Sequence, residues 1–245
     1  MSENQYSWVG VYKQIAKALV EKYKESPAAL FDSLRGIGLE IPENGDTVDP
    51  FTIFEWLTGG QKRKDAVDSD DMSREGKIGR IWHVLGKSPA ELPVTFGFDG
   101  LQENVTNWHA FVRMSEAELA KLWDLAETAS RGAFDAEVFA ECLEIRNIGP
   151  VNLTCGLYWL CPDVFIPYAS GAIGIVDYLS NNAKEIELRY TDGRTVSVPS
   201  GEENAFAVWY PVFLQDVKEK FGEKLYPFVH TAYEWKKNKI SASNA

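Results

Sequence analysis

The feature of this chain that most constrains its fold is an apolar stretch at residues 151–160, which has the sequence VNLTCGLYWL. Its apolar side chains fall on nearly every face of a helix rather than along one stripe. A helix of this kind has no face suited to water, so it must be buried among other elements. The sequence therefore predicts a helix in the centre of the protein core.

Most of the remaining sequence has the periodicity of amphipathic helices. A first helix is expected from Ser7 to about Lys24, because apolar residues recur there every three or four positions. The pattern Ser115-Glu-Ala-Glu118 is a capping box and predicts a helix start. Further helices are expected at residues 28–34, 73–85, 115–129, 135–143, 206–221 and 225–237. The predicted fold class is mainly α, as a single globular unit over residues 1–245.

Two segments depart from this helical pattern. Asp192-Gly193 is a strong turn signal, and its flanking segments predict a small β-hairpin near residues 184–199. Residues 93–108 have no helical period and are rich in Asn, Gln and aromatic residues, so an ordered irregular loop is expected there.

The formal net charge of −11 limits the kind of nucleic-acid binding that is possible. A protein that coats nucleic acid non-specifically needs extensive positive charge, so that class is excluded. An enzyme that holds a few phosphates with backbone amides and a small basic patch remains compatible with an acidic surface.

Cysteine usage and the hydropathy of the chain indicate a protein of the cytoplasm. The three cysteines form no CxxC pattern, so we expect reduced thiols, with no zinc site, other metal site or disulfide. The first ten residues, MSENQYSWVG, lack the basic start and apolar run of a signal peptide. No apolar run approaches the length of about eighteen residues that a membrane span needs.

The most informative motif is Asn147-Ile148-Gly149-Pro150, between the helix expected at residues 135–143 and the apolar helix. One helix ends, a short turn with a glycine follows, and a second helix starts at once. In a helix-hairpin-helix, such a turn directs backbone amides at a DNA phosphate, and glycine permits the close approach. The alternative is a purely structural helical corner with a glycine cap.

The hairpin hypothesis assigns the phosphate contacts to two groups of residues. The hairpin group is Asn147, Gly149, Val151 and Asn152. The basic group is Lys62, Arg63 and Lys64, with Arg74, Lys77 and Arg80 close by in the sequence. A run of charges is more often only solvated surface, so the hairpin carries the hypothesis.

This motif resembles the hairpin of the helix-hairpin-helix superfamily of base-excision DNA glycosylases, which includes endonuclease III and the 8-oxoguanine glycosylases. Their hairpin has the approximate sequence Leu-x-Gly-Val-Gly-x-x-Thr-Ala. Here Asn147-Ile148-Gly149 takes the place of Gly-Val-Gly, and Asn also adopts left-handed backbone geometry. The resemblance implies a glycosylase-like helical fold, with the helix-hairpin-helix at about residues 135–160.

Alignment on this hairpin also places the catalytic groups of the superfamily. The Asp that assists cleavage of the glycosidic bond falls at Ala169. The nucleophilic Lys of bifunctional members falls at Val151, which argues against a Schiff-base lyase. Asp177 and Asp99 are the fallback acids, although Asp99 before a glycine is typical of an ordinary turn.

A second resemblance is to the N-terminal region of some McrB-like AAA+ restriction ATPases. Its sequence blocks appear in order: YSWVGVYKQIAK from Tyr6, DPFTIF from Asp49, FDG from Phe98, VNLTCGLYW from Val151 and PDVFIP from Pro162. The Asp of that family's next block, Leu-Asp-Ser-Arg-Asn-Arg, again falls at Ala169. The chain has no GxxxxGK[ST] motif, so we expect no nucleotide cofactor and no other cofactor. It is either a stand-alone protein or an excised domain that partners a restriction ATPase.

The alanine at position 169 has two explanations. Either the natural protein lacks the acid and only binds DNA, or this chain is an inactivated variant in which Asp was changed to Ala. The distinction matters because cleavage of an N-glycosidic bond builds positive charge on the sugar, which a nearby carboxylate stabilises.

A glycosylase must also hold a flipped base between aromatic faces. Candidates for this base pocket are Phe51, Phe54, Trp56, Phe98, Trp108, Tyr158 and Trp159, most of which are expected to be core residues. The loop at residues 93–108 is the best candidate for reading a base modification.

Three functions remain open. The first is a monofunctional DNA glycosylase that excises hydroxymethylated or glucosylated cytosine from phage DNA in antiviral defence. The second is a non-catalytic domain that recognises modified DNA for an McrB-like restriction system. The third is a helical scaffold that contacts only protein.

Overall fold

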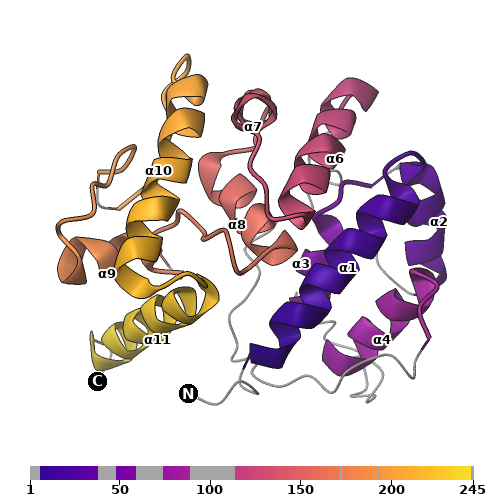
Figure 1. Cartoon of the computed structure of the whole chain (residues 1–245), viewed down its shortest axis with the longest axis horizontal. Coiled ribbons are helices and arrows are strands. Elements are labelled where there is room, and N and C mark those ends of the chain that lie inside the picture. The colour runs from indigo at the N-terminus through magenta and orange to yellow at the C-terminus, as the bar shows by residue number, and fades with distance from the viewer. Residues whose placement is uncertain are drawn as a thin grey trace.

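The computed structural model describes residues 6–37, 48–58, 74–88, 114–171, 173–192 and 194–243, and it is mainly helical (Figure 1). Its helices are α1 (Ser7–Tyr23), α2 (Pro27–Gly36), α3 (Thr52–Thr58), α4 (Arg74–Val84), α6 (Glu116–Ser130), α7 (Ala136–Leu143), α8 (Pro150–Leu160), α9 (Ile175–Asn182), α10 (Glu203–Phe221) and α11 (Tyr226–Ser243). The predicted mainly α fold class is confirmed.

The apolar helix α8 lies in the middle of the molecule, as its sequence requires. Nine of its eleven residues are buried. Helices α1, α6 and α7 pack directly against it, α10 packs against α7, and α11 packs against α9 (Figure 1). At Gly156 an added Cβ would lie 2.5 Å from the Phe51 ring. Only glycine therefore lets α8 approach this ring so closely.

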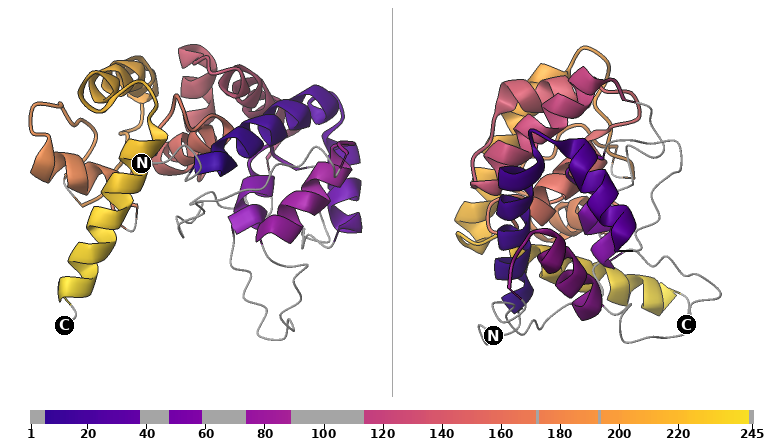
Figure 2. Two further views of the ribbon diagram at one scale, coloured as in Figure 1. Left: turned by 60° about the horizontal axis from the view of Figure 1, so that its bottom comes forward. Right: turned by 90° about the vertical axis from the view of Figure 1, so that its right-hand side faces the viewer.

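Aromatic side chains join the outer helices to this centre. The rings of Phe139 in α7 and Tyr210 in α10 are stacked, with centroids 5.7 Å apart. The rings of Tyr12 in α1 and Trp159 in α8 are likewise in contact, with centroids 5.5 Å apart. The last part of α11, after Lys236, is exposed and extends away from the other helices (Figure 2).

Local signals explain where two of the helices begin. The Ser115 hydroxyl accepts a hydrogen bond from the Glu118 amide, and the Ser115 amide donates to the Glu118 carboxylate, so the predicted capping box is confirmed. Asp135 caps α7 by accepting hydrogen bonds from the amides of Glu137 and Val138. None of the described helices combines the length and apolar composition needed to cross a membrane.

The predicted β-hairpin at residues 184–199 is wrong for the part of it that the structure describes. A single antiparallel bridge joins Thr191 to Val196, and no strand extends from it. The Asp192 carboxylate accepts hydrogen bonds from the amides of Arg194 and Thr195, at 2.8 and 2.9 Å. The turn signal was thus correct, but its flanking segments are held by contacts to other elements rather than by a ladder. The predicted loop at residues 93–108 lies outside the described residues.

Candidate nucleic-acid interface

The turn between α7 and α8 is short and contains a left-handed residue. Asn147 is left-handed, with φ of 63°. Gly149 is extended, with φ of −113° and ψ of 172°, and it is the N-cap of α8. Between them, Ile148 is only 4% exposed, and its amide donates to the Ile145 carbonyl. The buried isoleucines anchor the turn and leave Asn147 exposed.

The space in front of this turn is open. A Cβ added at Gly149 would meet no atom within 4 Å. Pro150 has no N–H, and the Leu153 amide already donates to the Gly149 carbonyl. Helix geometry directs the first-turn amide of Val151 out of the end of the helix. An anion that approached Gly149 would meet the positive end of the α8 dipole.

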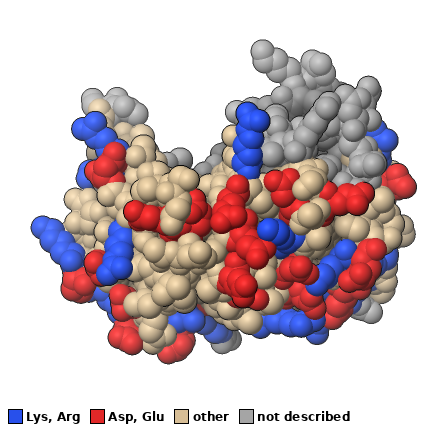
Figure 3. Space-filling view, turned by 90° about the horizontal axis from the view of Figure 1, so that it is seen from above, with Lys and Arg blue, Asp and Glu red and all other residues tan. Residues whose placement is uncertain are grey.

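Surface charge restricts the direction from which DNA could approach. Acidic side chains gather on the face seen from above in Figure 3, where α6 and α7 lie. Exposed carboxylates on these helices include Glu116, Asp124 and Glu137. This face repels phosphates, so a DNA backbone would have to approach the turn from another side.

Position 169 is linked to the hairpin through one buried hydroxyl. Thr154 in α8 donates to the Pro150 carbonyl at 2.7 Å and accepts from the Tyr168 amide at 2.9 Å. The next residue, Ala169, accepts a hydrogen bond from the Val176 amide at 3.0 Å through its carbonyl. Residue 169 therefore lies beside the first turn of α9, where a helix dipole would stabilise a carboxylate.

This chain holds no acid at that position. Ala169 is 1% exposed, so its methyl group belongs to the core. It does not line any of three surface cavities, of about 510 to 590 Å³, that we describe in this structure.

The fallback acid Asp177 is committed to a structural contact. Its Oδ1 lies 3.2 Å from Lys236 Nζ, which joins α9 to α11. Its Oδ2 is buried and has no hydrogen-bond partner among the described residues. At Gly174, the left-handed N-cap of α9, an added Cβ would lie 2.6 Å from Lys236. The two helices are thus tightly packed where Asp177 sits. The other fallback acid, Asp99, lies outside the described residues.

The structure places four of the proposed base-pocket residues in the core. Their exposed fractions are 0% for Phe51, 0% for Phe54, 1% for Tyr158 and 4% for Trp159. The rings of Phe54, Tyr158 and Trp159 contact other rings, as in the edge-on pair of Tyr158 and Trp159. None of the four lines one of the three cavities. Trp56 lies in α3, and Phe98 and Trp108 are outside the described residues.

The proposed basic patch is only partly described. Lys62, Arg63 and Lys64 lie outside the described residues, and Arg74 begins α4. Lys77 is 8% exposed, which is too buried for a phosphate contact. The Arg80 guanidinium donates to the Ile37 carbonyl at 2.9 Å and so supports the fold.

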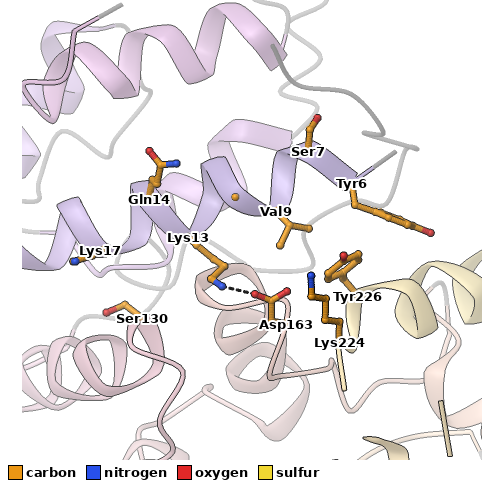
Figure 4. Close-up of a pocket in the computed structure, with 11 residues that line it drawn as sticks. Tyr6, Ser7, Val9, Lys13, Gln14, Lys17, Ser130, Asp163, Lys224 and Tyr226 are labelled. Carbon is orange, nitrogen blue, oxygen red and sulfur yellow. Dashed lines mark hydrogen bonds and ion pairs between the residues drawn. The ribbon is translucent and has the colours of Figure 1, made fainter. Parts of the chain in front are cut away.

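One feature of the molecule was missed by sequence reasoning. A cavity of about 520 Å³ lies between the exposed side of α1, the turn after α8 and the start of α11 (Figure 4). Its lining includes Lys13, Lys17, Lys224, Asp163, Tyr6 and Tyr226. The available signal was the spacing of Gly10, Lys13, Gln14 and Lys17, which places them on one face of a helix. That spacing is common on solvated helices, so it singled out no site. Among the described residues, no three His, Cys, Asp or Glu side chains are grouped to hold a metal ion.

Comparison with known proteins gives one family assignment. Neither the search of curated proteins nor the search of solved structures produced a match. A family model described as "Domain of unknown function (DUF8425)" matches residues 8–235, a range that includes the described helices apart from the first residue of α1 and the last part of α11. By that match over most of its length, the chain belongs to the DUF8425 family.

Proposed function

We propose that this chain binds DNA as a helix-hairpin-helix protein of the glycosylase type, and that the architecture serves the excision of a modified cytosine from phage DNA. The observation that carries the proposal is the turn from Asn147 to Gly149. A left-handed residue is followed by an open, extended glycine at the start of a buried helix. This conformation supports a close approach of a DNA phosphate to backbone amides without a positively charged surface.

The environment of residue 169 supports the catalytic part of the proposal. The hydrogen bonds of Thr154 connect the first turn of α8 to Tyr168, and hence to position 169 beside α9. An Asp at 169 would be fixed relative to a phosphate held at Gly149. Because position 169 is 1% exposed in this structure, DNA binding would have to uncover it before such an Asp could stabilise the positive charge that develops on a deoxyribose and orient the attacking water.

The burial of Ala169 favours a second candidate function for the chain as it stands. A methyl group in the core cannot stabilise an oxocarbenium ion. We therefore expect this chain to bind modified DNA without cutting it, as would a recognition domain that partners an McrB-like restriction ATPase. The two candidates share the same DNA contact and differ only in the acid at 169.

One experiment separates the candidates. This chain, Ala169→Asp and Ala169→Asn are incubated with phage DNA that contains hydroxymethylated or glucosylated cytosine, and alkali then cleaves any abasic sites. The excision proposal predicts strand breaks from Ala169→Asp alone, at a rate on the order of a hundredfold above Ala169→Asn. Circular dichroism checks that both variants fold.

The other outcomes are equally informative. Binding without breaks from any of the three forms would reject excision and leave the recognition domain. If none of the folded forms shifts modified DNA, both functions are wrong, and a scaffold that contacts only protein remains.

A further inference from the structure

We infer that the cavity between α1, the turn after α8 and the start of α11 is a binding site for a nucleoside phosphate (Figure 4). The cavity and the hairpin lie at opposite ends of α8. Gly149 of the hairpin caps the start of that helix, and Asp163 of the cavity follows its end. The inference therefore goes beyond the proposed function and does not depend on it.

The charge of the cavity selects an anionic ligand. Three lysines and one aspartate line it, in a protein whose formal net charge is −11. Lys13 forms an ion pair with Asp163, so these two charges offset each other. The other two lysines of the cavity, Lys17 and Lys224, give it a net positive charge. A concave site of positive charge on an acidic protein concentrates anions.

The two further cations are available to a ligand. Lys224 is exposed and forms no hydrogen bond or ion pair with the described residues. Lys17 contacts only Glu21, at 3.8 Å, and both side chains are more than half exposed. An exposed pair of this kind contributes little, so a phosphate could compete for Lys17.

The opposite end of the cavity suits a planar group. The rings of Tyr6 and Tyr226 lie 4.8 Å apart at that end, while Lys17 lies at the other (Figure 4). Between these ends, Gly10 offers no side chain to fill the space. The volume of about 520 Å³ falls within the range of about 300–1,000 Å³ that is usual for small-molecule sites.

A nucleoside phosphate combines these two requirements. Its phosphate would be held by Lys17, which lies one helical turn along α1 from the paired Lys13. Its base would lie against the ring of the half-buried Tyr226, which packs on the buried ring of Tyr6, since every base has a face that stacks on an aromatic side chain. The ligand is either a free nucleotide or one nucleotide of a DNA strand.

The test is a calorimetric titration of the full chain with deoxycytidine monophosphate, deoxycytidine and inorganic phosphate. The inference predicts that the monophosphate binds more tightly than either of its parts. Gly10→Glu should weaken its binding about tenfold or more, because it fills the cavity and adds a like charge. Lys17→Gln should weaken it several-fold, because it removes the cation at the phosphate end of the cavity.

Matched controls separate the site from general charge effects. Gly36→Glu adds the same charge at another exposed helical glycine with open space around it, and should leave binding unchanged. Lys184→Gln removes an exposed lysine outside the cavity, and should also have no effect. An added Cβ at Gly10 meets no atom within 4 Å, so Gly10→Glu should retain its fold and its melting temperature.

Three results would overturn the inference. These are absence of monophosphate binding, equal affinity for phosphate and monophosphate, and equal effects of Gly10→Glu and Gly36→Glu. Gly149→Glu should leave the titration unchanged, so failure here is distinct from failure of the hairpin proposal. Displacement of the monophosphate by a short single-stranded oligonucleotide would assign the site to a DNA strand, and retention would assign it to a free nucleotide.

Discussion

The Thr154 hydroxyl accepts a hydrogen bond from the backbone amide of Tyr168 at 2.9 Å while it donates to the carbonyl of Pro150 at 2.7 Å. Thr154 is 0% exposed, so neither backbone group that it serves has water as an alternative partner. One side chain thus fixes the start of α8 and the segment that carries residue 169 relative to each other.

Thr154→Val should therefore destabilise the protein. The substitution keeps the shape of the side chain but leaves the Tyr168 amide buried without its partner. We expect the free energy of unfolding in urea to fall by about 1–3 kcal/mol. Thr154→Ser, which keeps the hydroxyl, is the control and should lose less. Equal losses for the two variants would mean that packing, rather than the hydrogen bond, holds this contact.

The left-handed backbone at Asn147 gives a second stability prediction. Asn147→Ala should lower the free energy of unfolding by about 1 kcal/mol, because alanine lacks the short polar side chain whose local hydrogen bonds let asparagine tolerate φ of 63°. Asn147→Gly should retain or raise stability, and it should also retain DNA binding because it restores the Gly-x-Gly of the glycosylase hairpin. A comparison of urea midpoints and gel shifts for both variants checks the prediction. If the glycine variant were the less stable of the two, the left-handed turn would not be the native conformation.

Because its cysteines are buried, the folded protein should lose stability at alkaline pH. Burial raises the pKa of Cys142 from its ordinary value of 9.0 to about 12, and burial also raises the pKa of Cys155. Between pH 9 and pH 12 the unfolded chain releases these thiol protons while the folded chain keeps them. Stability is therefore complete below pH 9 and falls as the pH rises, by about 1.4 kcal/mol per pH unit for each thiol.

Urea unfolding between pH 7.5 and 10.5 measures this slope. In Cys142→Ala the slope should be smaller, even though the variant starts from a lower stability. All three cysteines are buried and none forms a disulfide, so a thiol reagent should label them only after unfolding. Rapid labelling of the folded chain at pH 8 would contradict the placement of these thiols.

The role of Asp177 can be tested in the background of Ala169→Asp. Because Asp177 pairs with Lys236 between α9 and α11, Asp177→Asn should lower the melting temperature. It should leave the rate of alkali-sensitive strand breakage unchanged. A loss of breakage with an unchanged melting temperature would instead identify Asp177 as the catalytic acid.

Local signals explain why most of the helices were predictable. The apolar stretch of α8 could only be a buried helix, and the Ser115 capping box marked the start of α6. The β-hairpin prediction at Asp192 was wrong because a turn depends on local sequence, whereas strand formation also depends on pairing with a neighbouring segment. There, Tyr190 packs against Phe206 of α10, and its segment does not extend into a ladder.

Only the backbone conformation of the candidate site could be predicted from the sequence. The Asn147 to Gly149 sequence indicates a tight turn, which the structure contains. The apolar pattern of residues 151–160 predicted that Tyr158 and Trp159 are buried, which the structure confirms, but nothing in the sequence indicated which aromatic side chains line a cavity, because that depends on tertiary packing. The cavity beside α1 joins residues more than 200 positions apart, from Tyr6 to Tyr226, and no local pattern could predict it.

The most direct test of the account is the effect of Gly149→Glu on binding to duplex DNA that contains modified cytosine. The backbone at Gly149 is in an ordinary region and the space before it is open, so the variant should fold normally. We predict that it binds at least about tenfold more weakly than the unchanged chain, because a carboxylate would occupy the phosphate position. Gly36→Glu, with the same added charge elsewhere, should bind as the unchanged chain does. Equal binding by Gly149→Glu and Gly36→Glu would contradict the claim that this hairpin holds the DNA backbone.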